Sequence, residues 1–302
     1  MGSRDLAAAA VVVLIWGLNL IFIVEGLEQF TPMQLGAARF ALTAFPLMFV
    51  VARPGIPLRD LVLYALFQGV GQFVLLFLAL RLGMSGALAS VIAQVQPFFT
   101  AIFAALWLRE RWSRSLRIGF VVAAVGLACF IAQTLQPSVR EEVTLLGIVL
   151  TLGAAASWAA SNIVVRRLAA AGARYDALSL VVWGAVVTTP FFLIASLVVD
   201  SPTSHANWLN ASLSGWVAIG YQAWGASLIG YGLWTALLKR HPASRVGPFS
   251  MAVPVIGVVA GMTWLGDTVT GLQWVGTALI LLALAIVFSG ARREDLRARA
   301  GR

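Results

Sequence analysis

Residues 96–110, QPFFTAIFAALWLRE, have a counterpart in residues 253–267, VPVIGVVAGMTWLGD, and this pair of stretches decides the fold. At a shift of 157 positions, Pro97 falls on Pro254, and a later Trp-Leu pair falls on another Trp-Leu pair. The other matches at this shift are Trp107 with Trp264, Glu110 with Asp267, Gly119 with Gly276 and Tyr64 with Tyr221. One match between helices rich in Ala, Leu and Gly can arise by chance, but several at one offset indicate an internal repeat.

The composition predicts an all-α membrane protein. Of the 302 residues, 60% are hydrophobic and 11% are charged, whereas a soluble globular protein has about 25% charged residues. A helix needs about 20 apolar residues to cross the hydrocarbon layer. Ten segments meet this requirement, so we predict ten transmembrane helices: 6–25, 33–51, 61–82, 86–108, 116–132, 145–168, 177–199, 213–238, 243–265 and 271–289.

The repeat and the charges predict the topology. Each half holds five segments, and an odd number makes the second half enter the membrane from the opposite side, as an inverted repeat. The predicted units are a first five-helix repeat over 1–135, a second, inverted repeat over 136–290 and a basic tail over 291–302. With the N-terminus inside, 18 of the 21 basic residues lie on one face. The positive-inside rule therefore predicts cytoplasmic N- and C-termini and a multi-pass protein of the inner (plasma) membrane.

Several classes of chemistry are excluded. The chain has one lysine, Lys239, and Arg240 follows it, so the phosphate loop GxxxxGK[ST] is absent. One cysteine, Cys129, excludes an intramolecular disulfide and a cysteine metal cluster. His205 and His241 are expected in loops on opposite membrane faces, so no hydrolase set is formed. We therefore expect a transporter and not an enzyme, with no cofactor, no metal and, because the basic residues follow the topology, no nucleic-acid partner.

A family resemblance agrees with this interpretation. The motifs are IWGLN at 15–19, ARF at 38–40, and QPFFTAIFAALWLRERW at 96–112 followed by RIG. Together with ten predicted spans in two halves, they resemble the EamA type of the drug/metabolite transporter superfamily, and within it the amino-acid exporters. Gly266-Asp267 stands where Gly-Glu is usual. The resemblance implies export of small metabolites, including aromatic and other amino acids.

Polar residues inside the predicted helices are candidates for a substrate cavity, since polar groups at membrane depth face a bundle interior or water. Tyr64, Gln68 and Gln72 recur every four residues and form one stripe. The other candidates are Trp16, Asn19, Gln94, Trp158, Asn162, Tyr221, Trp224 and Tyr231. Amide groups can donate to a carboxylate and accept from an ammonium group. The alternative is that the amides are interhelical hydrogen bonds and the aromatic rings form interface belts.

Four further residues concern gating and charge. Arg39 lies inside the second predicted helix, where it is expected to snorkel outward or to pair with Glu25 or Glu28; contact with a substrate carboxylate is the alternative. Pro97 and Pro254 lie in repeat-related helices and are candidates for hinges, because proline loosens the backbone hydrogen bonds locally. A simple close-packed helix crossing is the alternative.

The predicted function is alternating-access export of small metabolites, with amino acids as the substrates and the lipid bilayer as the other partner. No acidic residue lies near the predicted midplane, which favours uniport over proton antiport. A proton-coupled exporter of aromatic or cationic drugs is the first alternative, and a membrane-embedded enzyme or lipid flippase is the second. The sequence leaves a monomer and a homodimer equally open.

Overall fold

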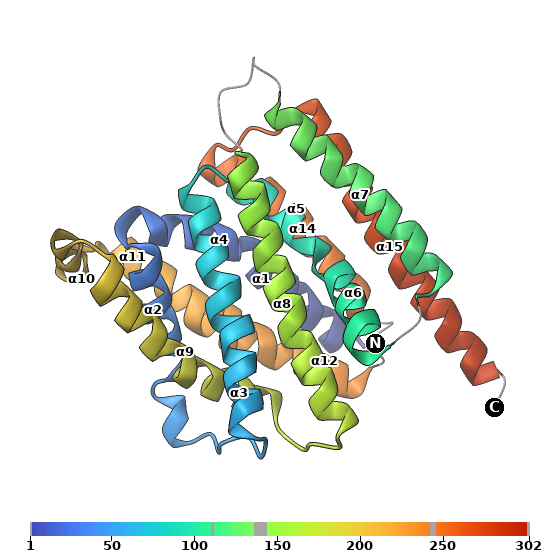
Figure 1. The fold of residues 1–302 in the computed structure, drawn as a ribbon, viewed down its shortest axis with the longest axis horizontal. Helices are drawn as coiled ribbons and strands as arrows, with labels where there is room; N and C mark the ends of the chain where they lie inside the picture. Colours follow the sequence, from blue (N-terminus) through green and yellow to red (C-terminus); the bar gives the residue numbers. More distant parts are fainter. Residues whose placement is uncertain (1, 110–111, 136–143, 242–245, 301–302) are drawn as a thin grey trace.

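The computed structural model describes residues 2–109, 112–135, 144–241 and 246–300, without the side chains of 238, 239, 247, 248 and 291–300. Its described residues form helices and turns and contain no β-strand, which confirms the all-α prediction for this part of the chain (Figure 1).

The elements of the first half of the chain are α1 (Ser3–Gln29), α2 (Pro32–Ala44), η1 (Leu47–Phe49), α3 (Leu58–Tyr64), η2 (Ala65–Gly71), α4 (Gln72–Arg81), α5 (Gly86–Ile92), η3 (Ala93–Val95), α6 (Gln96–Leu108) and α7 (Arg114–Thr134). Those of the second half are α8 (Leu145–Ala170), α9 (Ala177–Val199), η4 (Pro202–Ala206), α10 (Asn207–Asn210), α11 (Leu213–Gly220), η5 (Tyr221–Gly230), α12 (Tyr231–Arg240), η6 (Gly247–Met251), α14 (Ala252–Ala260), η7 (Gly261–Leu265) and α15 (Gly271–Ala300).

Seven helices in the described part are long and apolar enough to cross a membrane: Ser3–Gln29, Leu58–Arg81, Gly86–Leu108, Arg114–Thr134, Leu145–Ala170, Ala177–Val199 and Gly271–Gly290. A shorter apolar helix covers Phe249–Leu265. Each of the ten predicted segments contains helical structure in its described residues, but α2 ends at Ala44, short of the predicted end at residue 51, and 213–240 is divided between three elements. Residues 243–245 of the predicted helix 243–265 lie outside the described residues. The count of ten spans and the side on which the termini lie stay predictions.

Side-chain caps set where several helices begin. At α2 the Thr31 hydroxyl accepts from the Gln34 backbone N–H at 3.1 Å, and the Gln34 side chain accepts from the Thr31 N–H at 3.2 Å. This capping box satisfies two helix donors that would otherwise lack partners. Ser113 and Thr144 cap α7 and α8 in the same way, with single bonds of 3.2 and 3.0 Å.

Several predicted helices are interrupted near their centres. The helix over 58–81 contains a π-helical segment, η2, and the helix over 213–240 contains another, η5. A shift of 157 positions carries η2 onto 222–228, inside η5. Wide π turns break the regular hydrogen-bond ladder and are frequent at functional sites. The middle of each of these two helices is therefore a candidate location for a functional site.

Helix pairs far apart in the sequence lie side by side. The helices α7 and α15 run together along one side of the molecule, at the right of Figure 1, and α2 packs against α9. Glycine allows the α7–α15 contact to be close: a Cβ on Gly126 would lie 2.9 Å from the Gly276 carbonyl oxygen, and one on Gly276 would lie 2.8 Å from the Gly126 oxygen. Small residues at such crossings are typical of membrane helices.

Two segments outside the predicted transmembrane helices are helical. The polar stretch 200–212 contains η4 and α10, and Gln34 Nε2 at the start of α2 donates to its Ser204 carbonyl at 2.8 Å. The backbone of the basic tail continues α15 as helix to Ala300, whereas the last predicted helix ended at residue 289. The predicted boundary at 135–136 meets residues 136–143, which lie outside the described residues.

Candidate functional site

A cavity lies where four helical runs meet, two from each half of the chain. Its lining comes from α2, from the run α3–η2–α4, from α9 and from the run η5–α12. The lining residues are Arg39, Phe40, Thr43, Tyr64, Ala65, Gln68, Gly69, Phe73, Val181, Gly184, Ala185, Thr188, Ser227 and Tyr231. Of the predicted site residues, Tyr64, Gln68 and Tyr231 are brought together here, with Arg39 beside them.

Gln68 is the centre of the polar contacts in this cavity. Its Nε2 donates to Gln72 Oε1 at 2.9 Å and to the Tyr231 hydroxyl at 3.3 Å. Its Oε1 accepts a hydrogen bond of 2.7 Å from the Ser161 hydroxyl on α8. The amide orientation is therefore fixed from two sides, and Gln72 supports Gln68 without lining the cavity itself.

The contribution of α9 was missed by sequence reasoning. Gly184 allows the Tyr64 ring to pack against α9, because a Cβ at position 184 would lie 2.9 Å from that ring. Gly69 does the same for Thr188, whose hydroxyl would lie 2.2 Å from an added Cβ. The available signal was Gly184 and Thr188 at i, i+4 on one face of an otherwise apolar helix.

Arg39 does not form the structural ion pair that the sequence predicted. The side chain is 4% exposed, and its only described hydrogen bond goes from Nη2 to the Ser227 hydroxyl at 3.4 Å. Its Nε and Nη1 have no hydrogen-bond partner among the described residues. The expected pair with Glu25 or Glu28 is therefore not formed among the described residues, because α2 turns the guanidinium into the cavity and toward α4 and η5.

Trp16 forms a wall next to the cavity without lining it. Its ring centroid lies 5.3 Å from that of Tyr231 and 5.3 Å from that of Trp234, and its Nε1 donates to the Ala226 carbonyl at 3.1 Å. Trp16 thus fixes η5 and α12 against α1. Trp16 therefore contacts the cavity only indirectly, by packing against Tyr231, which lines it.

The remaining predicted residues do not line the cavity in this conformation. Tyr221 donates to the Ile15 carbonyl at 2.9 Å, and Trp224 donates to the Leu42 carbonyl at 3.1 Å. Gln94 donates to the Ser250 carbonyl at 3.4 Å, and Asn162 to the Thr100 hydroxyl at 3.5 Å. Asn19 has a buried Oδ1 that meets no hydrogen-bond donor of the described residues, and Trp158 is half-buried on α8.

The two candidate hinges lie where helices change type. Pro97 is in the first turn of α6, directly after the short 3₁₀ segment η3, and Pro254 is in the first turn of α14, directly after η6. The helix α5, which precedes η3 and α6, crosses α14 closely, since a Cβ on Gly257 would lie 2.6 Å from the Ser90 hydroxyl. The close crossing therefore lies beside Pro254, in the helical turn before the break that leads to Pro97.

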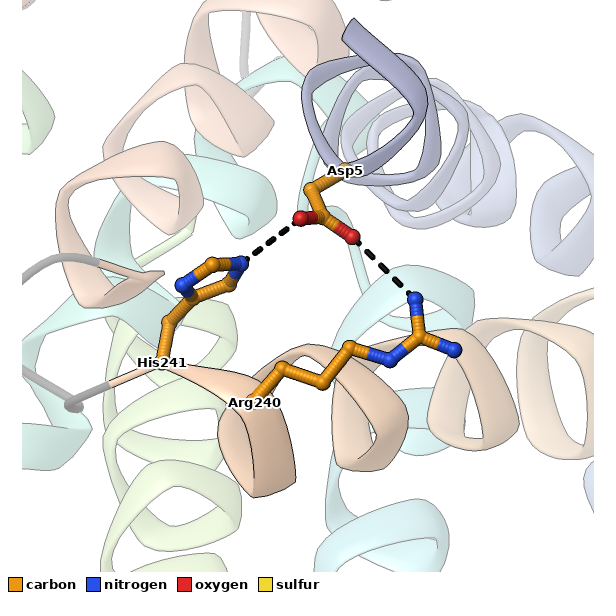
Figure 2. Close-up of polar contacts among 3 residues, drawn as sticks. All are labelled: Asp5, Arg240 and His241. Carbon is orange, nitrogen blue, oxygen red and sulfur yellow. Dashed lines mark hydrogen bonds and ion pairs between the residues drawn. The ribbon is translucent and has the colours of Figure 1, made fainter. Parts of the chain in front are cut away.

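A second polar cluster joins the start of α1 to the end of α12 (Figure 2). One oxygen of Asp5 lies 2.8 Å from His241 Nε2, and the other accepts from Arg240 Nη1 at 3.2 Å. A small cluster of buried side chains, Ala9, Leu237 and Val246, packs near this end of the two helices. Among the described residues, no group of three or more His, Cys, Asp and Glu could hold a metal ion.

Comparison with known proteins identifies the family. The model of the EamA-like transporter family matches residues 5–132 and 145–289. The chain belongs to the EamA-like transporter family. This EamA-like protein is therefore a membrane transporter and not an enzyme, which confirms the prediction made from the motifs.

Its relatives are similar over nearly their whole length. A "Probable amino-acid metabolite efflux pump" of Escherichia coli (strain K12) is 37% identical, and one of Salmonella typhimurium is 38% identical, each with 97% of both chains covered. A solved structure aligns with a TM-score of 0.63 at 17% identity, covering 98% of this chain and 100% of the other. That likeness concerns the fold alone.

Proposed function

We propose that this EamA-like transporter exports amino acids, including aromatic ones, from the cytoplasm by alternating access around the cavity near Gln68. One observation carries the proposal: the cavity is lined by α2, η2, α9 and η5, so both halves of the chain contribute to it. A site at the junction of two repeats is the position that lets their relative motion open it to one side and then the other. The names of the relatives agree with export of amino-acid metabolites.

The inverted repeat over 1–135 and 136–290 is supported by features at the same offset. The π-helical segments η2 and η5 correspond at 157 positions, and so do the helix caps Ser113 and Thr270. The family model also matches one segment in each half. We propose Pro97 and Pro254 as the points at which the two corresponding helices bend during transport.

The positive-inside rule supports a cytoplasmic N-terminus and C-terminus in the inner membrane. On this orientation, Asp5 and His241 lie at the cytoplasmic end of α1 and α12. Substrate would enter from that end and leave on the opposite side.

We further propose uniport. The cavity lining, taken over the described residues, contains no Asp or Glu, and a proton-coupled antiporter usually keeps a titratable carboxylate in its pathway. The same absence argues against an exporter of cationic drugs, since a buried cation normally needs an acidic partner or an aromatic cage.

The test is transport by the purified protein in proteoliposomes. Labelled aromatic and aliphatic amino acids are assayed one at a time, with and without an imposed pH gradient. Saturable flux that is independent of the gradient supports an amino-acid uniporter. Flux that follows the gradient contradicts uniport, and absence of flux for every amino acid contradicts the substrate class.

A further inference from the structure

The guanidinium of Arg39 lies in the cavity with most of its hydrogen-bonding capacity unused. The residue is 4% exposed, and neither Nε nor Nη1 has a hydrogen-bond partner in the part of the chain that the structure describes. The bond from Nη2 to the Ser227 hydroxyl is long, at 3.4 Å, and that hydroxyl itself donates to the Gln222 carbonyl at 2.9 Å. Buried charges in proteins are normally paired and hydrogen-bonded, so this group is an exception that needs a physical reason.

Two aromatic faces stabilise the guanidinium. The Arg39 Cζ lies 3.9 Å from the centroid of the Phe73 ring and 5.6 Å from that of Phe40. A cation over an aromatic face is stabilised by the ring electrons without a hydrogen bond. The two stacking contacts hold the side chain in the cavity and leave its N–H groups free to meet a ligand.

The charges of the lining indicate what kind of ligand fits. Arg39 is the one charged residue of the described cavity lining, which contains no Asp or Glu. The Tyr64 hydroxyl also lines the cavity and makes no hydrogen bond to a described residue. An anionic group would meet a cation and an unused hydroxyl donor, whereas a cationic ligand would be repelled by Arg39 and would find no carboxylate in the described lining.

We propose that Arg39 binds the carboxylate of the transported substrate and that the carboxylate, not the amino group, is what the cavity recognises. The planar guanidinium fork matches the two oxygens of a carboxylate and can donate to both. The proposal rests on the proposed function, because it takes this cavity as the transport site. It deepens that function by naming the substrate class as small carboxylates, amino acids and their N-acylated forms included.

Recognition through the carboxylate has a consequence for the amino group. No carboxylate of the described lining is available to hold an ammonium group, so neutralising the amine by acylation removes no ion pair. Converting the carboxylate to an amide, in contrast, leaves the Arg39 charge buried beside a neutral group. Acylation of the amine should therefore leave binding largely unchanged, whereas conversion of the carboxylate to an amide should weaken it.

The experiment compares three probes: L-phenylalanine, N-acetyl-L-phenylalanine and L-phenylalaninamide. For each one, the concentration that gives half-maximal thermal stabilisation of the purified full-length protein is measured. In the natural sequence both carboxylates should bind roughly 10- to 100-fold more tightly than the amide, as expected for hydrogen bonds to charged groups. Arg39→Gln should abolish this preference, and Arg39→Lys should keep part of it.

Arg81→Gln is the matched control, because Arg81 is exposed at the end of α4 and its Nη1 donates to the Leu27 carbonyl, away from the cavity. It should keep the full preference for carboxylates. Equal binding of the amide by the natural sequence overturns the proposal, and so does an unchanged preference in Arg39→Gln. If Arg39→Gln does not fold, the comparison of the three probes on the natural sequence decides alone.

The outcome can be separated from that of the transport assay. A preference for carboxylates that Arg39→Gln abolishes, without flux of any amino acid, supports the Arg39 site and contradicts the amino-acid substrate. Amino-acid flux with equal binding of acid and amide supports the amino-acid substrate and contradicts the Arg39 site.

Discussion

Arg109 and Gly266 lie 157 positions apart, and both end a helix in the left-handed backbone conformation, with φ angles of 55° and 70°. The helix C-termini of the two halves therefore have the same backbone shape, although one residue is arginine and the other glycine. Glycine adopts this conformation without a Cβ clash, whereas other residues are destabilised in it.

Substitution at these two caps should change stability in opposite directions. Gly266→Ala is expected to reduce the free energy of unfolding by about 1 kcal/mol, and Arg109→Gly is expected to raise it by up to the same amount. An added Cβ on Gly266 meets nothing within 4 Å, so the effect is purely conformational. The measurement is the thermal unfolding midpoint in detergent.

Gly271→Ala is the control for these caps. Gly271 is also open to its surroundings but has no positive φ, so alanine there should cause no loss. An unchanged midpoint in Gly266→Ala would contradict the assigned cap geometry.

Gln68 should be needed for substrate affinity and not only for packing. Gln68→Leu removes its bonds to Ser161 and Tyr231 and makes the cavity less polar. We expect the KM of transport to rise about 2- to 10-fold, the range for one or two lost hydrogen bonds. The measurement is the concentration dependence of uptake into proteoliposomes.

Gln222→Leu provides the comparison for Gln68. Gln222 is fully buried and donates to the Phe22 carbonyl at 3.1 Å, but it does not line the cavity. Its loss should lower stability and leave KM unchanged. Equal KM values for Gln68→Leu and the natural sequence would mean that the stripe in this helix is packing.

The sequence predicted the helices well because length and apolar composition alone decide them. The predicted 177–199 coincides with α9, Ala177–Val199. Of the predicted stripe, Tyr64 and Gln68 line the cavity and Gln72 does not. The interruptions were not predicted, because η2 and η5 contain no proline and depend on contacts such as that between Gly69 and Thr188.

The direction of Arg39 could not be predicted for a related reason. A helix inside a membrane bundle is apolar on most faces, so its composition does not fix its rotation. Contacts of α2 with α9 and of Phe40 with Phe73 and Phe192 determine that rotation. These contacts join residues distant in sequence, and they turn Arg39 away from the expected pair with Glu25.

Gly230 should be essential for the position of Trp16. A Cβ on Gly230 would lie 2.4 Å from Trp16 Nε1, too close to be accommodated without movement. Gly230→Ala is therefore expected to displace the indole, break its bond to the Ala226 carbonyl and lower stability by about 1–3 kcal/mol. Transport should fall together with the unfolding midpoint, as in Trp16→Ala.

Gly232→Ala is the matched control, because a Cβ two positions along meets nothing within 4 Å. It should leave both transport and stability close to those of the natural sequence. A normal transport rate in folded Trp16→Ala and Trp158→Ala proteins would contradict the sequence prediction that these rings belong to the substrate cavity.

The contact of Asp5 with Arg240 and His241 should hold the proposed cytoplasmic ends of α1 and α12 together (Figure 2). The Arg240 side chain is 67% exposed, and exposed ion pairs contribute little, so His241 is expected to be the more important partner.

Leu237 is buried at the same end and reports whether the helices separate. In a Cys129→Ser, Leu237→Cys background, Asp5→Asn should increase the rate of maleimide labelling severalfold, because the loosened ends expose position 237 more often. Arg4→Gln removes a neighbouring exposed charge and should leave the rate unchanged. His241→Ala combined with Asp5→Asn should label no faster than the faster of the two single variants, since both changes remove one shared interaction. Additive effects would mean that the two side chains act independently and that their contact does not hold the helices.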